Sequence, residues 1–248
     1  MTEIKTIRVG DEDREATREL LARFRTLAES ARTRHPQALV SRSGSEPLVL
    51  AEEQIARALR LDEEYGGGKP LPLSDADQLV EHLLTTLAEL EQALHDAGED
   101  GIAEEVDAIV LGVALWAIRH DLAIVPVEPV ANALAHQANT AANPQALAAT
   151  FGLMQGVIEN VSPRLEADLE RSNPERTWRI LLLNLAITAI RTQDEAMMAW
   201  AFDRLDAGLP SERAGFYAEA LALALAPGVA APVRERIEAR HLKWTASH

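Results

Sequence analysis

Apolar residues recur along almost the whole chain at the spacing of an α-helix, and this periodicity constrains the fold more than any other feature. The two-residue alternation of a half-buried strand is nearly absent. Asn143-Pro144, Ser162-Pro163 and Asn173-Pro174 each offer a side-chain cap followed by a proline that fits a first helical turn. The pattern therefore predicts an all-α protein of about ten helices.

Turn residues and caps place the expected helices along the chain. The segments are 11–34, 48–63, 74–97, 102–118 and 129–141, then helices that start at Pro144, Pro163 and Pro174, and finally 194–207, 211–226 and 232–245. Short connections after residue 74 predict antiparallel hairpins, packed as a multi-helix bundle or as a repeat-like superhelix. Segments 108–118 and 178–190 are apolar nearly all round, so we expect each to be covered on several sides.

The first 73 residues have longer loops than the rest, which predicts an N-terminal helical segment at 1–73 and a main helical domain at 74–248. One continuous domain, 1–248, is the alternative. Ile4, Ile7 and Val9 suggest one short strand. Gly66-Gly67-Gly68 is expected to be a flexible linker, because no strand precedes it and no Ser or Thr follows Lys69 as in a phosphate-binding loop.

Composition limits the compartment and the partners. The chain has no cysteine and its N-terminus has no apolar leader, so a cytoplasmic protein is expected. Its longest uncharged apolar runs are too short for the ~20 residues that span a bilayer. The net charge is −15, with 18 acidic against 5 basic residues between positions 36 and 122. Such a field disfavours nucleic acid and anionic membranes and favours solubility or a basic partner.

One segment, 179–212, resembles a tetratricopeptide unit. The positions that match the small and large positions of that repeat are Leu182, Leu185, Ala186, Ala189, Met198, Phe202, Leu205 and Pro210. The repeat's aromatic anchor and glycine are replaced by Leu182 and Ala186, and no second copy matches. The resemblance implies a helical-repeat architecture of the kind that binds protein partners.

Two His-Asp pairs, His95-Asp96 and His120-Asp121, stand twenty-five residues apart. The pattern resembles the metal-binding residues of HD-domain phosphohydrolases. That resemblance implies His95, His120 and Asp121 as metal ligands, with Asp168 or Asp194 as a fourth. The competing interpretation is helix capping, because both pairs fall at predicted helix ends.

The segment from Leu122 to Ser162 carries only two charges, Glu128 and Glu159. Its other polar side chains are uncharged, and four of them recur at helical spacing: Asn132, His136, Asn139 and Asn143. Such a face suits a protein interface or a ligand groove. Burial among other helices, with these groups bonded to nearby carbonyls, is the alternative.

These observations favour binding over catalysis. No serine-hydrolase or zinc-protease motif occurs, and the paired carboxylates fall on predicted polar faces. The sequence therefore predicts a non-enzymatic scaffold or adaptor without a cofactor or metal. It is expected to bind a protein partner, or to form a homo-oligomer, through residues 129–160 or through the acidic surface of 50–107. A metal-dependent phosphohydrolase that uses His95, His120 and Asp121 is the alternative.

Overall fold

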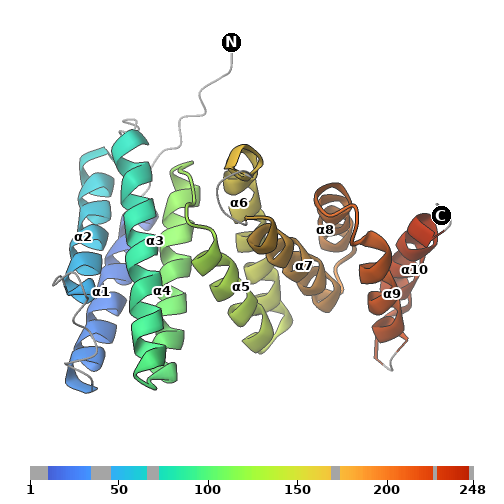
Figure 1. Ribbon diagram of the computed structural model, residues 1–248, viewed down its shortest axis with the longest axis horizontal. Helices are drawn as coiled ribbons and strands as arrows, with labels where there is room; N and C mark the ends of the chain where they lie inside the picture. Colours follow the sequence, from blue (N-terminus) through green and yellow to red (C-terminus); the bar gives the residue numbers. More distant parts are fainter. Residues whose placement is uncertain (1–10, 35–45, 66–72, 169–173, 226–227, 246–248) are drawn as a thin grey trace, which may run out of the picture. The chain divides into compact units, whose positions relative to one another are not determined.

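Ten α-helices fill the part of the chain that the computed structural model describes, which is residues 11–34, 46–65, 73–168, 174–225 and 228–245 (Figure 1). They are α1 (Asp11–Arg34), α2 (Pro47–Tyr65), α3 (Leu73–Asp96), α4 (Asp100–Arg119), α5 (Glu128–Thr140), α6 (Pro144–Asp168), α7 (Pro174–Thr192), α8 (Glu195–Gly208), α9 (Arg213–Ala224) and α10 (Ala231–Thr245). No strand occurs among these residues. The predicted all-α class is therefore confirmed.

The chain forms two compact units. The first comprises Met1–His136 with Gly156–Arg164, and the second comprises Gln137–Gln155 with Leu165–His248. The described helices on both sides of residue 73 belong to the first unit. None of the described helices combines the length and the hydropathy needed to cross a bilayer.

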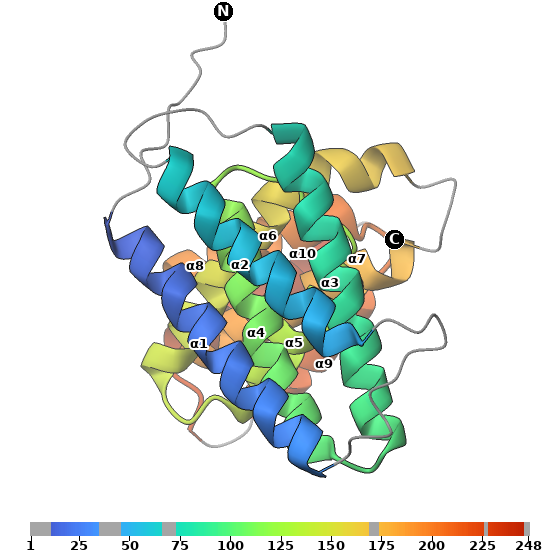
Figure 2. The same ribbon diagram turned by 90° about the vertical axis from the view of Figure 1, so that its left-hand side faces the viewer.

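Four helices close a ring in the first unit (Figure 2). α1 packs against α2 and α4, while α3 packs against the same two helices from the other side. Phe24, Leu84 and Ile109 are fully buried on the facing sides of α1, α3 and α4. Apolar stripes at helical spacing on each helix thus meet in one core, as in a four-helix bundle.

A buried carboxylate, Asp62 at the end of α2, joins three parts of this bundle. Its side chain is fully buried and accepts hydrogen bonds from Thr17 Oγ1 at 2.6 Å, Trp116 Nε1 at 3.0 Å and His120 Nε2 at 2.8 Å. The donors come from α1, from α4 and from the residue that follows α4. Each otherwise costly buried polar group thereby has a partner.

The second unit contains two helical hairpins, α7 with α8 and α9 with α10. The α7–α8 hairpin covers the segment that resembles a tetratricopeptide unit. Phe202 of α8 meets Tyr217 of α9 edge to face, with 5.2 Å between ring centroids. This contact ties the second hairpin to the first one.

A second buried carboxylate, Asp206 of α8, fixes α9 and α10 in place. Its side chain accepts hydrogen bonds from Tyr217 Oη at 2.9 Å and from Trp244 Nε1 at 3.1 Å, and it is paired with Arg240. Burial and the neighbouring Asp206 raise the pKa of Tyr217 above its ordinary value, so that phenol stays protonated and donates. The position of α9 thus depends on a network that is centred on α8.

One predicted helix start is wrong. α6 runs from Pro144 to Asp168 without a break at Ser162-Pro163. A proline inside a helix removes one backbone donor and crowds the carbonyl four residues earlier, and this cost is offset by the packing of the same helix, on which Ile158 and Val161 are buried. The suggested strand at Ile4–Val9 and the expected linker at residues 66–68 lie outside the described residues.

Candidate functional site

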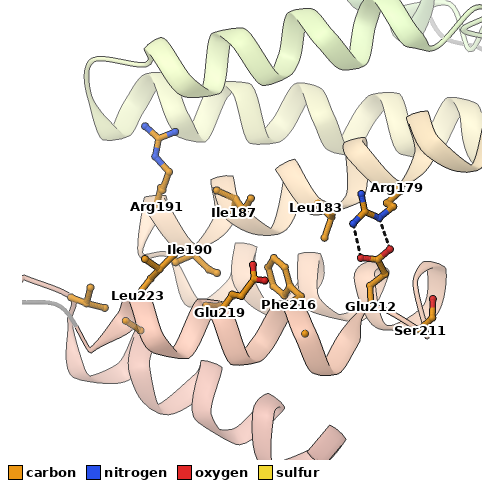
Figure 3. A pocket seen from close by; sticks show the side chains of 14 residues that line it. Arg179, Leu183, Ile187, Ile190, Arg191, Ser211, Glu212, Phe216, Glu219 and Leu223 are labelled. Atoms are coloured by element: carbon orange, nitrogen blue, oxygen red, sulfur yellow. Dashed lines mark hydrogen bonds and ion pairs between the residues drawn. The ribbon is translucent and has the colours of Figure 1, made fainter.

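A groove of about 580 Å³ lies between α7 and α9 in the second unit (Figure 3). We call it the α7–α9 groove. Its walls are mainly aliphatic and aromatic: Leu183, Ile187 and Ile190 come from α7, and Phe216, Ala220 and Leu223 come from α9. Both sets follow the i, i+4, i+7 spacing of one helix face, so two apolar stripes face the same space.

The groove exists because α7 is apolar on more faces than its neighbours cover. Leu182, Leu185 and Ala186 are fully buried, whereas Ile187 on the other side is 44% exposed. The expectation that 178–190 is covered on several sides is therefore wrong for the groove face. Across the gap, α9 presents Gly215, where an added Cβ would meet nothing within 4 Å. Small residues on that wall leave the space unfilled.

Apolar exposure is high on both walls of the groove. Leu223 of α9 is 74% exposed, and Ile187 of α7, which lines the same groove, is 44% exposed. Single exposed apolar side chains are ordinary on protein surfaces, but facing ones that line a common hollow mark binding surfaces. In the α7–α9 groove, Leu223 and Ile187 line one common hollow.

Charged residues close the two ends of the groove. At one end Arg179 pairs with Glu212 through two hydrogen bonds, of which the one from Nη2 is 2.9 Å long (Figure 3). This guanidinium lowers the pKa of the Glu212 carboxyl. At the other end Arg191 turns away from the groove, and its Nη1 donates to the carbonyl of Ala138 at 2.6 Å. Both cations at the groove ends are thus already engaged.

Glu219 differs from these charged residues. It is exposed and lines the groove between the apolar side chains of α9, next to Phe216 (Figure 3). It makes no hydrogen bond or ion pair with any other residue that the structure describes. The groove therefore carries one carboxylate whose charge is not balanced within the described chain.

The lining residues offer contact surface but little chemistry. Ser211 is the hydroxyl among them, and no histidine stands beside it to act as a base. Arg179 lowers the pKa of the Glu212 carboxyl, whereas a general acid needs a carboxyl with a raised pKa. The described residues of the lining thus present mainly apolar contact surface.

Comparisons with family models, with curated proteins and with solved structures find no match for this chain. The residues of the molecule are therefore the guide to its function.

The polar residues predicted as an interface have mixed positions. Asn132 and Asn139 are exposed on α5, and His136 is half-buried, with its Nδ1 3.4 Å from the Asp107 carboxylate. Asn143 caps α6, because its Oδ1 accepts a hydrogen bond from the amide of Ala146 at 2.8 Å. Asn143 thus has a structural role that its sequence position also predicted. An interface at residues 129–160 stays a prediction.

The structure does not bring the three candidate metal ligands together. His95 Nδ1 lies 2.8 Å from Asp100 at the start of α4, whereas His120 follows the end of α4 and contacts Asp62. The 20 residues of α4 separate the two imidazoles by about 30 Å. Asp121 is exposed and has a φ of 54°, which suits a turn after the helix.

No group of three or more potential ligands that could hold a metal occurs among the described residues. Asp194, one of the suggested fourth ligands, caps α8 by accepting from the amides of Ala196 and Met197. The side chain of Asp168, the other one, lies outside the described set. Both His-Asp pairs lie at helix ends, as the sequence predicted, but the His120 side chain is a buried partner of Asp62 and the His95 side chain contacts Asp100.

A small titratable cluster lies on α3, α4 and α5 in the first unit. Partial burial raises the pKa of Glu91 and of Asp107, and the negative charge of Asp107 raises the pKa of Glu91 further. His95 and His136 offset this effect in part. The hydrogen bond that His95 Nδ1 donates to the Asp100 carboxylate raises the pKa of His95. The acidic and histidine side chains of this cluster thus interact with one another, and the described ones form no group that could hold a metal.

Proposed function

We propose that this chain is a non-enzymatic helical scaffold that binds a partner protein in the α7–α9 groove. The observation that carries the proposal is the pair of uncovered apolar stripes on α7 and α9, which face one hollow. Burial of apolar surface contributes about 25 cal/mol per Å² removed from water, so covering these stripes is a driving force for association.

A protein is a better occupant than a small molecule. Small-molecule pockets enclose their ligand and aim several polar groups at it. Here Leu223 and Ile187 remain widely open to solvent, and the arginines at the groove ends are bound to Glu212 and to the Ala138 carbonyl. A long apolar segment would use these walls, whereas a compact polar ligand would find few convergent partners.

The architecture agrees with this proposal. One wall of the groove, α7, belongs to the hairpin whose sequence resembles a tetratricopeptide unit, and helical repeats of that kind present their helices as binding surfaces. The net charge of −15 also favours a basic partner by long-range attraction. Self-association through the same groove is the competing occupancy, and it is distinguished by the oligomeric state.

The test compares two matched charge insertions in the second unit. Ile187→Asp places a carboxylate in the groove, and Leu242→Asp places one on α10 at a side chain that is 58% exposed and does not line the groove. A photo-reactive amino acid at position 223 is then used to cross-link bound proteins in cells. We expect cross-linked products that disappear in Ile187→Asp and persist in Leu242→Asp.

Equal products from both variants would remove the groove from consideration as a binding site. Light scattering on the same three proteins shows whether the occupant is a second copy. A dimer that Ile187→Asp converts to a monomer would assign the groove to self-association. A monomer in all three samples, together with selective cross-links, supports a separate partner.

A further inference from the structure

We infer that the occupant of the α7–α9 groove is an amphipathic α-helix of a partner protein that presents a lysine or an arginine to Glu219. This inference rests on the proposed function and gives the chemistry of the partner. It depends on three features of the groove: its length, the helical nature of its walls, and the single unbalanced carboxylate inside it.

The groove has the length of a short helix. Its α7 wall extends over the thirteen residues from Arg179 to Arg191, whose twelve helical rises span about 18 Å. An occupant of about three helical turns matches this length. The apolar positions at 183, 187 and 190 repeat at turn intervals, so side chains spaced i, i+3 or i+4, and i+7 on the occupant can lie between them.

The walls also favour a helix over an extended segment. Both walls are α-helices, whose backbone donors and acceptors are used within each helix. An extended peptide that lies on such walls finds no exposed strand edge and leaves its own amides and carbonyls without partners. A helix satisfies its own backbone groups and presents only side chains, which is what two apolar stripes require.

Glu219 sets the charge of the occupant. An apolar helix that covers Glu219 would remove water from its ionised carboxylate without providing a hydrogen-bond donor or a positive charge, which is unfavourable. A lysine or arginine on the occupant restores the balance, and with Phe216 next to Glu219 the cation lies at the boundary between apolar and polar surface. An acidic occupant gains nothing at the ends of the groove, because Arg179 and Arg191 are already bound to Glu212 and to the Ala138 carbonyl.

The test uses random 16-residue peptides displayed on phage and selected on the full-length protein, with Ile187→Asp as the counter-selection target. We expect the groove-dependent peptides to share apolar residues at helical spacing and at least one basic residue. Each synthesised peptide is then measured by fluorescence anisotropy. Circular dichroism of the complex, from which the spectrum of the free protein is subtracted, reports whether the peptide becomes helical on binding.

Charge exchange at Glu219 is the decisive measurement. Glu219→Lys should lower the affinity for a lysine-bearing peptide by about tenfold. A peptide in which glutamate replaces that lysine should bind the Glu219→Lys variant with the original affinity. Glu219→Gln should show an intermediate loss. The control is Glu235→Lys, on the exposed surface of α10 and outside the groove lining, which makes the same charge change.

The outcomes separate this inference from the proposed function. The inference is overturned if the groove-dependent peptides are proline-rich, stay extended, or bind with an affinity that does not depend on the charge at position 219. The proposed protein-binding function would then still stand. Peptides that bind wild type and Ile187→Asp equally would overturn both. Because position 187 is partly exposed, Ile187→Asp should fold, and Leu223→Asp at a more exposed position repeats the test if it does not.

Discussion

Replacement of Asp62 by alanine should destabilise the first unit more than almost any other single change. Asp62 is fully buried and its carboxylate accepts from Thr17, Trp116 and His120. Alanine leaves three buried donors without an acceptor, at about 1–3 kcal/mol each. Rotation of the Thr17 hydroxyl and entry of water into the vacated space recover part of this loss. We therefore expect a net loss of about 3–5 kcal/mol.

Asp62→Asn provides the matched control. The side-chain oxygen of asparagine can still accept from Trp116 and His120, which both bond Oδ1. Its amide can donate to Thr17 Oγ1, since a hydroxyl both donates and accepts. The shape and most of the hydrogen bonds are kept, so we expect a loss of about 1 kcal/mol.

Urea unfolding followed by circular dichroism measures both variants, and hydrogen exchange locates the change. With a denaturant slope of about 2 kcal/mol per molar, Asp62→Ala should lower the midpoint by about 2 M. Exchange should accelerate in α1, α2 and α4 and stay unchanged in α8 to α10. An alanine variant within about 1 kcal/mol of wild type would refute the reasoning. An asparagine variant as unstable as the alanine one would show that the charge of Asp62 dominates over its hydrogen bonds.

Three further predictions concern the second buried carboxylate, a helix cap and a half-buried acid. Asp206→Ala removes the acceptor of Tyr217, Trp244 and Arg240, so it should cost about 2–3 kcal/mol and accelerate hydrogen exchange in α8 to α10 only; equal acceleration in α1 to α4 would contradict it. Asn143→Ala should lower the free energy of unfolding by about 1 kcal/mol in thermal melts, whereas Asn143→Asp keeps the cap; equal losses would show that capping is not its role. Because burial raises the pKa of Glu91 above 4.5, its ionisation costs stability as the pH rises from about 4.5 through the folded-state pKa. Glu91→Gln should thus be more stable than wild type at pH 7 and no different below pH 4, and urea midpoints that move together at both pH values would count against this assignment.

Helix positions were largely predictable from the sequence because caps, prolines and apolar spacing act locally. The helix at 11–34 and the starts at Pro144 and Pro174 agree with the structure, and hairpin packing follows from the short connections. The failure at Pro163 has the opposite cause. Whether a proline begins a helix or is carried inside one depends on the packing of residues around it, and that packing is not local.

The candidate groove was present in the sequence as a signal that we interpreted in the wrong direction. An apolar excess around 178–190 indicates more apolar surface than one neighbour can cover. The prediction assigned that surface to the core, whereas the structure leaves Ile187 and Leu183 in an open groove. An apolar face in the core and one that lines an open groove have the same periodicity. What distinguishes them is the distance between α7 and α9 and the small residues, such as Gly215, on the facing wall.

The buried carboxylates were also beyond sequence reasoning. Asp62 lies 54 residues from Trp116 and Asp206 lies 38 residues from Trp244, so no local spacing connects donor and acceptor. The one clue is that both aspartates end the same tripeptide, Arg60-Leu61-Asp62 and Arg204-Leu205-Asp206. A charged residue directly after an apolar one is too common to mark burial by itself.

Each of the two buried carboxylates accepts a hydrogen bond from a different tryptophan, which makes these tryptophans useful as spectroscopic reporters. Trp116 in the first unit and Trp244 in the second each donate the indole N–H to an aspartate. A charge-assisted hydrogen bond of this kind is strong and moves the indole proton resonance downfield. In a nitrogen-15 spectrum of this chain, which has four tryptophans, each unit therefore carries its own internal signal. Loss of one signal while the other persists would report the opening of one unit alone, with no probe attached to the protein beyond the isotope.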